Sequence, residues 1–241
     1  MVSSDFRKEA REKLTGKWGK AVLITLAYFV LFYVIGLLEE HTSGFANTVV
    51  SILSLLIEVP LSFGLVVCFV KLFNGEDVKV FDFFSFGFDN FSKSWGISLR
   101  TILKLLLPFI LFVVSIALVV AGITLSTNSA LFTRTVSSNS IIMIIICCII
   151  TVISFIWLIV KSYYYELTYM IAAENPEMSS KDIVEKSKEL MQNHRLELFC
   201  LEFSFIGWAI LAVLSLGIGM LWLAPYMQIA KISFYKNLIK E

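Results

Sequence analysis

Long uncharged stretches alternate with short charged ones along this chain of 241 residues. Four apolar stretches lie in the first two thirds of the chain, at residues 21–38, 49–70, 97–124 and 141–160. One crossing of a bilayer takes about 17–25 apolar residues of helix, and each stretch reaches that length. The pattern therefore predicts four membrane-spanning helices in this part of the chain.

A fifth apolar stretch, residues 203–226, carries no charge and fits two arrangements. As a single helix it would measure about 36 Å, which is somewhat more than one bilayer crossing. Its middle, Ser215-Leu-Gly-Ile-Gly219, contains glycines that permit a tight reversal of the chain. The stretch is therefore either one long span or the tip of two spans that fold back on each other.

The placement of Lys and Arg favours the folded-back arrangement. Six basic residues precede residue 21, none lies between the first two spans, and Arg134 is alone between the third and fourth. Loops rich in Lys and Arg stay in the cytoplasm, and only a hairpin keeps this alternation for the last three lysines. We therefore expect six spans as three hairpins, with both termini cytoplasmic. Five spans remain the alternative, because only 35 residues separate Arg195 from Lys231.

Each expected hairpin follows a stretch with amphipathic helical spacing. The first stretch carries Phe6, Ala10, Leu14 and Trp18 at intervals of four. The second carries Phe81, Phe84, Phe88, Phe91 and Trp95 on one helical face. A third helix begins at Ser179, with Asp182 in a capping position and Ile183, Leu190, Met191 and Leu198 on its apolar side. We expect the first two to lie on the inner membrane surface.

The fold class is therefore all-α, a polytopic membrane protein with a single integral membrane domain over residues 1–241. A cytoplasmic amphipathic helix followed by a transmembrane hairpin recurs three times, and Trp18-Gly19 and Trp95-Gly96 occupy equivalent junctions. The repetition predicts an internal triplication with units 1–75, 76–176 and 177–241. The alternative is that any protein with six spans and a cytoplasmic N-terminus has some amphipathic junctions.

Composition agrees with a bilayer environment. The chain is 58% hydrophobic and 16% charged, whereas soluble domains are about 25% charged. The four cysteines lie in apolar stretches without a C-x-x-C pair, which argues against a disulfide framework or a zinc site. No phosphate-binding loop, zinc-protease motif or nucleophile elbow is present in the sequence. We therefore expect neither a metal nor a cofactor, no nucleic-acid partner, and no enzymatic activity.

One pair of residues in the second span is unusual enough to be a candidate polar site. Glu58 near the centre of a span is unfavourable by a few kcal/mol, and Pro60 leaves the carbonyl of Leu56 without its helical donor. The structural interpretation is a protonated Glu58 bonded to that carbonyl or to Ser54. The functional interpretation is a proton or cation site with further charged residues near its inner mouth. The candidate set is Glu58, Pro60, Lys104, Lys161 and Glu202.

The segments "AREKLTGKWGKAV" and "AAENPEMSSKDIVEKSKELMQNH" and the C-terminal FIGW, LGIG, PY and FY elements resemble domain-of-unknown-function family 975. This resemblance implies an uncharacterised integral membrane protein of a bacterial plasma membrane. Trp157 and Leu158 replace a Pro-Gly pair that is common in the family. We read Gly207 as a close-packing position and Gly217 with Gly219 as a turn. The family pattern falls on Gly16, Trp18, Gly19, Pro60, Gly64, Asn175, Pro176, Ser187, Met191, Phe205, Gly207, Trp208, Gly217, Gly219, Pro225, Tyr226, Phe234 and Tyr235.

Two classes of function remain open at this stage. The first is a non-enzymatic membrane protein, either transporter-like or an accessory or scaffold subunit of a membrane complex. The second is a membrane-embedded lipid-modifying enzyme, although the sequence offers it no recognisable nucleophile. The expected partners are anionic lipids of the inner leaflet, and another membrane protein or a second copy of this chain.

Overall fold

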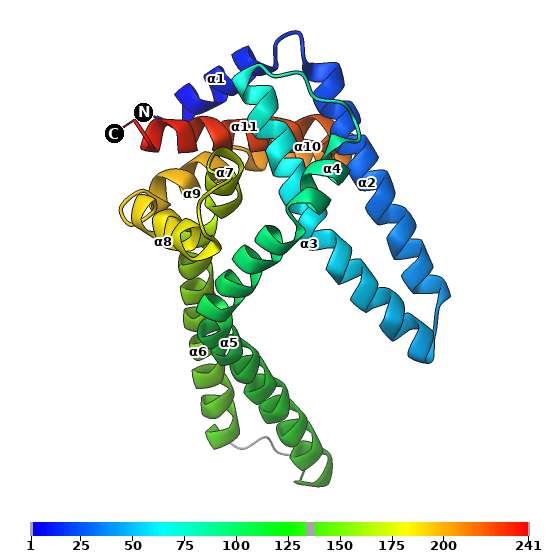
Figure 1. The fold of residues 1–241 in the computed structure, drawn as a ribbon. Coiled ribbons are helices and arrows are strands. Elements are labelled where there is room, and N and C mark those ends of the chain that lie inside the picture. Colours follow the sequence, from blue (N-terminus) through cyan, green and yellow to red (C-terminus); the bar gives the residue numbers. More distant parts are fainter. Residues whose placement is uncertain (1, 134–137, 241) are drawn as a thin grey trace.

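The structure, a computed structural model, describes the backbone of residues 2–133 and 138–240 and the side chains of residues 2–127 and 141–240. Within these ranges every regular element is helical, which confirms the all-α prediction. The elements shown in Figure 1 are α1 Ser3–Leu14, α2 Trp18–His41, α3 Gly44–Asn74, α4 Asp82–Asp89, α5 Phe91–Thr133, α6 Ser138–Ser162, η1 Tyr163–Tyr165, α7 Thr168–Glu174, α8 Ser180–Leu190, α9 Arg195–Phe203, α10 Ile206–Leu214 and α11 Met220–Leu238.

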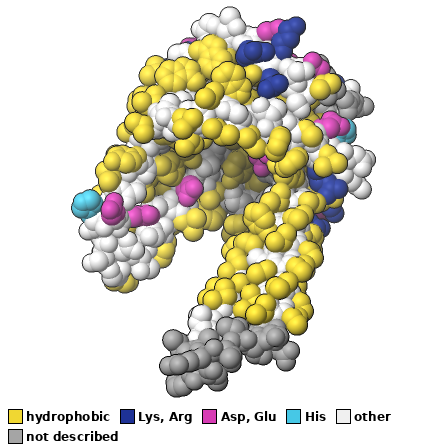
Figure 2. Space-filling view, turned by 180° about the vertical axis from the view of Figure 1, so that it is seen from behind, with side chains coloured by type: hydrophobic (Ala, Val, Ile, Leu, Met, Phe, Trp, Pro, Cys, Tyr) yellow, Lys and Arg dark blue, Asp and Glu magenta, His cyan; other side chains and the backbone are white. Residues whose placement is uncertain are grey.

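Two long helical hairpins, α2 with α3 and α5 with α6, diverge from a head in which α1, α7, α8, α9 and α11 pack together (Figure 1). The hairpins expose large apolar side chains, such as Leu103 at 68% and Ile153 at 62%. In Figure 2 hydrophobic side chains cover the hairpin that ends in grey, and Lys and Arg lie over the head and at the hairpin's upper end. Such surfaces suit lipid and not water.

Five helical segments in the described part of the chain are long and apolar enough to cross a membrane. They are Trp18–His41, Gly44–Asn74, Phe91–Thr127, Ile141–Glu174 and Arg195–Leu214. The first four contain the four spans that the sequence predicts, so the molecule has the character of a membrane protein. Helix α11, which carries Lys231 and Lys236, is not among the five.

The amphipathic face of α1 is buried within the protein, which corrects the expectation that it faces the membrane. Phe6, Ala10 and Leu14 are 2%, 0% and 0% exposed. The ring of Phe6 meets that of Phe234 on α11 edge-on, with centroids 5.5 Å apart. The apolar face of α11 is available in the head, and burying two aromatic rings against each other removes both from water. The two termini therefore lie close together (Figure 1).

Helix α3 is joined to the second hairpin around Pro60. The indole Nε1 of Trp95 donates a hydrogen bond to the carbonyl of Leu56 at 3.3 Å, so the donor that Pro60 cannot provide comes from α5. The structural interpretation of the sequence has Glu58 bonded to this carbonyl or to Ser54. The carbonyl is instead bonded to Trp95, and Ser54 donates to Val50 within its own helix.

Glycine explains how closely α4 crosses α3 at this junction. A Cβ added to Gly64 would lie 2.8 Å from the backbone nitrogen of Gly87 and closer still to the carbonyl oxygen of Phe83. A Cβ added to Gly87 would in turn clash with the carbonyl of Pro60. The two backbones touch because neither helix has a side chain at the crossing.

The aromatic segment 81–95 is two helices and not one, because the chain breaks at Asn90 between α4 and α5. Phe83, outside the predicted stripe, is the fully buried ring, and it packs among the helices of the first hairpin. Phe81, Phe88 and Phe91 are 66%, 46% and 40% exposed. Most of the predicted aromatic face thus remains uncovered by protein, and its contact with the membrane stays a prediction.

The third amphipathic segment begins where it is predicted, since the Ser179 hydroxyl caps α8 by accepting from the backbone N–H of Asp182 at 3.2 Å. It is not one continuous helix, however, because turns separate α8 from α9 between residues 190 and 195. Its apolar residues Ile183, Met191 and Leu198 are nevertheless all buried. All four cysteines are free thiols.

The chain reverses between α10 and α11, where the glycine-containing turn is predicted. Leu216 and Gly217 both have positive φ, at 55° and 84°, a conformation that glycine adopts freely and leucine seldom does. Helix α10 has only nine residues, about 14 Å, so this hairpin is much shorter than the other two.

Candidate amphiphile-binding groove

The structure does not bring the five residues of the predicted polar site together. Glu58 and Lys104 are exposed on α3 and α5, and Pro60 is buried. Lys161 lies over the ring of Tyr164, 5.7 Å from its centroid. Glu202 on α9 forms an ion pair with Lys231 at 2.6 Å. No ion pair in the described part of the chain joins any two members of the set.

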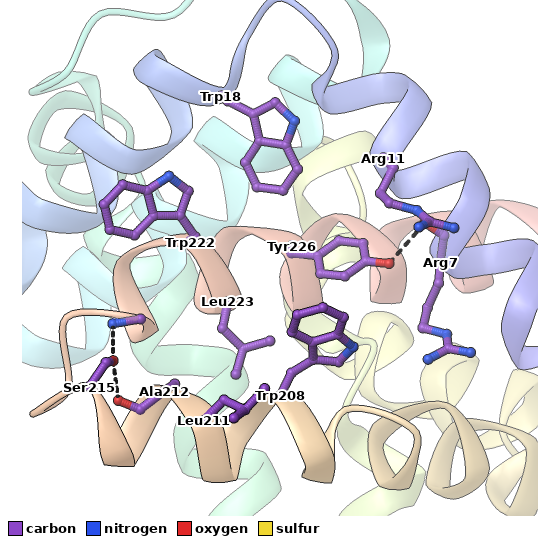
Figure 3. Close-up of a pocket in the computed structure, with 11 residues that line it drawn as sticks. Arg7, Arg11, Trp18, Trp208, Leu211, Ala212, Ser215, Trp222, Leu223 and Tyr226 are labelled. Carbon is purple, nitrogen blue, oxygen red and sulfur yellow. Dashed lines mark hydrogen bonds between the residues drawn. The ribbon is translucent and has the colours of Figure 1, made fainter.

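A different feature brings together basic and aromatic side chains from distant parts of the sequence. It is a groove of about 620 Å³ between α1, the start of α2, α10 and α11, and it is shown in Figure 3. Its size lies within the range of about 300–1,000 Å³ that is typical of small-molecule sites. We call it the arginine–tryptophan groove. Its lining residues are Arg7, Arg11, Trp18, Trp208, Leu211, Ala212, Ser215, Gly219, Trp222, Leu223 and Tyr226.

One end of the groove is positively charged. The Nη1 atom of Arg7 donates to the carbonyl of Ser204 at 3.3 Å, while its Nε is buried and has no hydrogen-bond partner. Arg11 is exposed one helical turn further along α1. Neither arginine takes part in an ion pair among the described residues, and no carboxylate lines the groove. This end therefore has uncompensated positive charge.

Tyr226 ties the groove's walls together. Its hydroxyl donates to the backbone carbonyl of Arg7 at 3.2 Å, and its ring lies 6.1 Å from that of Trp18 and 5.0 Å from that of Phe205. The hydrogen bond ties α11 to α1, and the two ring contacts add the start of α2 and Phe205 to the same wall.

The rest of the groove is apolar. Trp208 projects from α10 toward Tyr226, and Trp222 projects from α11 above Leu223 (Figure 3). These two indoles are 57% and 50% exposed, so their faces are available to a ligand or to lipid. Trp side chains are typical of the boundary between headgroups and hydrocarbon.

The far end of the groove is closed by the hairpin turn. The Ser215 hydroxyl donates to the carbonyl of Ala212 at 2.7 Å and accepts from the N–H of Gly219 at 2.9 Å. A Cβ on Gly219 would lie 2.8 Å from the Cα of Ala212, which explains the glycine there. Since Ser215 caps the turn with both bonds, its oxygen is not poised as a nucleophile. No group of His, Cys, Asp and Glu in the described residues could hold a metal ion.

Four positions that the family resemblance selects, Trp18, Trp208, Gly219 and Tyr226, line this groove. The two arginines were missed as site residues, because the sequence shows them only as part of a basic segment. Their spacing of four was the available signal, since residues i and i+4 share one helical face.

The other family positions have structural roles or none that the structure explains. Gly16 and Gly217 have positive φ, at 77° and 84°. Asn175 and Pro176 follow the end of α7, as expected of a turn, and both carbonyls accept hydrogen bonds from Lys93. The expected close packing at Gly207 is wrong, because a Cβ there would meet nothing within 4 Å. A Cβ on Gly19 would also meet nothing within 4 Å, so the structure does not explain that glycine.

Comparison with known proteins gives one match. The whole chain, residues 1–241, matches a family described as "Protein of unknown function (DUF975)". No curated protein and no solved structure matches the chain.

Proposed function

The chain belongs to the DUF975 family of proteins of unknown function, and from this premise we propose that it is a non-enzymatic multi-pass membrane protein. It serves as an accessory or scaffold subunit of a membrane complex and holds an anionic lipid of the inner leaflet in the arginine–tryptophan groove. The observation that carries this proposal is the pair of arginines, without a carboxylate among the lining residues, at one end of an apolar groove.

The chemistry of a phospholipid fits both ends of this groove. The planar guanidinium groups of Arg7 and Arg11 suit phosphate oxygens, which accept charge-assisted hydrogen bonds. The buried Nε of Arg7 lacks an acceptor, and a phosphate oxygen could supply one. Acyl chains suit the exposed faces of Trp208 and Trp222. Each basic residue near an anionic membrane surface contributes about 1 kcal/mol of attraction.

Binding is favoured over catalysis because the groove's hydroxyl groups are already engaged. Ser215 caps the hairpin turn and Tyr226 donates to α1, so neither is paired with a general base. A lipid-modifying enzyme remains the competing function. It predicts that purified protein changes the lipid composition of vesicles containing anionic phospholipids, whereas our proposal predicts unchanged lipid.

An accessory or scaffold role is favoured over a transporter-like one for a similar reason. A transport site needs polar groups that converge near the membrane centre. Glu58 and Lys104 are instead exposed, and Lys161 lies over the ring of Tyr164. Glu202 pairs with Lys231, so none of these four described residues forms an ion pair with another. The long apolar hairpins diverge and offer lipid-facing surface to another membrane protein or to a second copy of this chain (Figure 1).

We also propose the layout in the membrane. The protein lies in a bacterial plasma membrane, with three hairpins and both termini cytoplasmic, as the Lys and Arg pattern indicates. The third hairpin, α10 with the start of α11, enters the inner leaflet and returns. The whole segment Arg195–Leu214 is long enough for a span, but α9 packs in the head and its Glu202 pairs with Lys231. This leaves only α10, about 14 Å, to enter about 30 Å of hydrocarbon. An impermeant thiol reagent should label a cysteine at Ser43 from outside the cell but not one at Ser215. Labelling of both would instead support six complete spans.

The proposed function is tested by lipid binding to the full chain in mild detergent, followed by native mass spectrometry. Wild-type protein should bind phosphatidylglycerol in preference to phosphatidylcholine. Arg11→Gln should weaken the phosphatidylglycerol affinity of this groove about fivefold, since it removes one charged contact. The matched control is Lys8→Gln, which removes the same charge from an exposed position of the same helix outside the groove. Equal loss in both variants would show that the groove has no specific role.

A further inference from the structure

A second groove of about 620 Å³ lies between α6 and α9 and shares no lining residue with the first. Its apolar wall comes from Ile156, Ile159 and Val160 of α6 together with Leu196 and Phe199 of α9. Its polar end is formed by Tyr163, Gln192, Asn193 and Arg195. No acidic residue lines it, so this groove also combines an apolar wall with an arginine and neutral polar groups.

Two cations lie near one aromatic ring next to the polar end of the α6–α9 groove: Arg195 lines the groove, and Lys161 follows its lining residue Val160 in α6. The guanidinium carbon of Arg195 lies 4.3 Å from the centroid of the Tyr164 ring, and the Nζ atom of Lys161 lies 5.7 Å from the same centroid. Neither cation forms an ion pair among the described residues. The ring's π-face attracts each cation but does not neutralise either one. An anion bound at Arg195 would neutralise the charge that faces the groove.

The surrounding carboxylates are occupied elsewhere. Glu202 accepts from the hydroxyl of Tyr163 at 2.5 Å and pairs with Lys231 at 2.6 Å. Glu197, on the same helix as Arg195, lies 3.2 Å from Nδ1 of His194. The protein thus places two carboxylates nearby yet directs neither to Arg195 or Lys161. The positive charge at this end remains available to a ligand.

The position of the groove identifies the source of that ligand. Ile156, Ile159 and Val160 belong to the last turns of α6, which forms the apolar part of a segment long enough to cross a membrane. Lys161 and Tyr163 follow directly, at the level where charged and aromatic residues mark the membrane boundary. A ligand with its anionic group at Arg195 and an apolar chain along α6 would therefore extend from the headgroup region into the hydrocarbon.

We propose that the α6–α9 groove is a second, independent lipid site that binds the phosphate of an inner-leaflet anionic phospholipid at Arg195, with Lys161 as the neighbouring second cation. The side-chain amides of Gln192 and Asn193 supply neutral hydrogen bonds to the headgroup. An acyl chain lies against Ile156, Ile159 and Phe199. This inference does not depend on the arginine–tryptophan groove, because the two share no lining residue.

The test counts phosphatidylglycerol molecules bound to the full chain in mild detergent by native mass spectrometry. Arg195→Gln should weaken one binding event about tenfold, since it removes a charged hydrogen-bonding group, and should leave the other unchanged. Lys161→Gln should weaken the same event. The unchanged event at the arginine–tryptophan groove shows that the variant is folded. The matched control is Lys188→Gln, an exposed residue of α8 outside both grooves.

Three outcomes distinguish a bound lipid from a free anion, and the second site from the proposed function. Competition of the Arg195-dependent event by inorganic phosphate as effectively as by phosphatidylglycerol would mean that a free anion is bound, and would overturn the lipid site. Equal binding by wild type and Arg195→Gln would overturn it too. If Arg11→Gln has no effect while Arg195→Gln removes one lipid, the proposed function fails and the second site stands.

Discussion

Lys231 is the residue whose loss should most disturb the head. Its Nζ atom lies 2.7 Å from Glu166 and 2.6 Å from Glu202, and thereby joins α11 to the segment after η1 and to α9. The Lys231 side chain is only 17% exposed. Replacing it by methionine keeps most of the buried stem but leaves two carboxylates facing each other without a cation.

The size of the effect follows from the exposure of the three side chains. Removing one partner of a fully buried ion pair costs about 3–5 kcal/mol. Glu166 and Glu202 are 38% and 26% exposed, so water screens part of the repulsion. We therefore expect Lys231→Met to lower the free energy of unfolding by about 2 kcal/mol. For a chain of this length that corresponds to a decrease in Tm of about 4–8 °C.

The dependence on pH gives an independent signature. Burial tends to lower the pKa of Lys231, but Glu166 and Glu202 together outweigh it and raise the pKa above the usual value of 10.5. A raised pKa in the folded state means that the stabilisation is complete below about pH 10.5 and is lost as the pH rises through the folded value. The difference between wild type and Lys231→Met should thus be constant near neutral pH and shrink above about pH 10.5.

Thermal unfolding in detergent, followed by helical circular dichroism, measures these quantities. Adding Glu166→Gln and Glu202→Gln to Lys231→Met should restore most of the lost stability, since the repelling charges are gone. Lys240→Met, at an exposed position beyond α11, is the matched control and should have no effect. A Tm for Lys231→Met within 1 °C of the wild-type value would refute the view that this ion cluster stabilises the head.

Two further predictions concern the junction of the hairpins. Gly64→Ala should lower the free energy of unfolding by about 3 kcal/mol, because the new methyl group meets the backbone of Phe83. The control Gly207→Ala adds a methyl group that meets nothing and should be neutral, and chemical unfolding of both variants tests this. Trp95→Phe should cost about 1 kcal/mol by leaving the Leu56 carbonyl without its indole donor, and an unchanged unfolding midpoint would argue that water replaces the bond.

The spans were predictable because lipid imposes a simple rule on length and charge. A helix in hydrocarbon must be long and mostly apolar, so the stretches that lie within α2, α3, α5 and α6 are visible without any knowledge of their packing. The reversal after α10 was visible for a related reason, since glycine marks it. The internal triplication stays a prediction.

The amphipathic segments were harder, because an apolar stripe does not say what covers it. The stripe of α1 has the same pattern whether it meets lipid or α11, and the structure shows that Phe6 contacts Phe234. The arginine–tryptophan groove could not be predicted from the sequence for the same reason. Arg7 and Trp208 are about 200 residues apart in the chain, and only the packing of α1 against α9 and α11 brings them to one surface. Glu58, whose sequence context is unusual, is exposed and takes no part in this groove.

The most direct test of the central claim uses the groove's own tryptophans. Three of the five tryptophans, Trp18, Trp208 and Trp222, line it, and bromine on a lipid acyl chain quenches indole fluorescence on contact. The protein would be placed in nanodiscs with equal fractions of brominated phosphatidylglycerol or brominated phosphatidylcholine. We predict stronger quenching by the anionic lipid in wild type, and loss of that excess in Arg11→Gln but not in Lys8→Gln. Equal quenching by the two lipids in wild type would contradict an anionic lipid held in this groove.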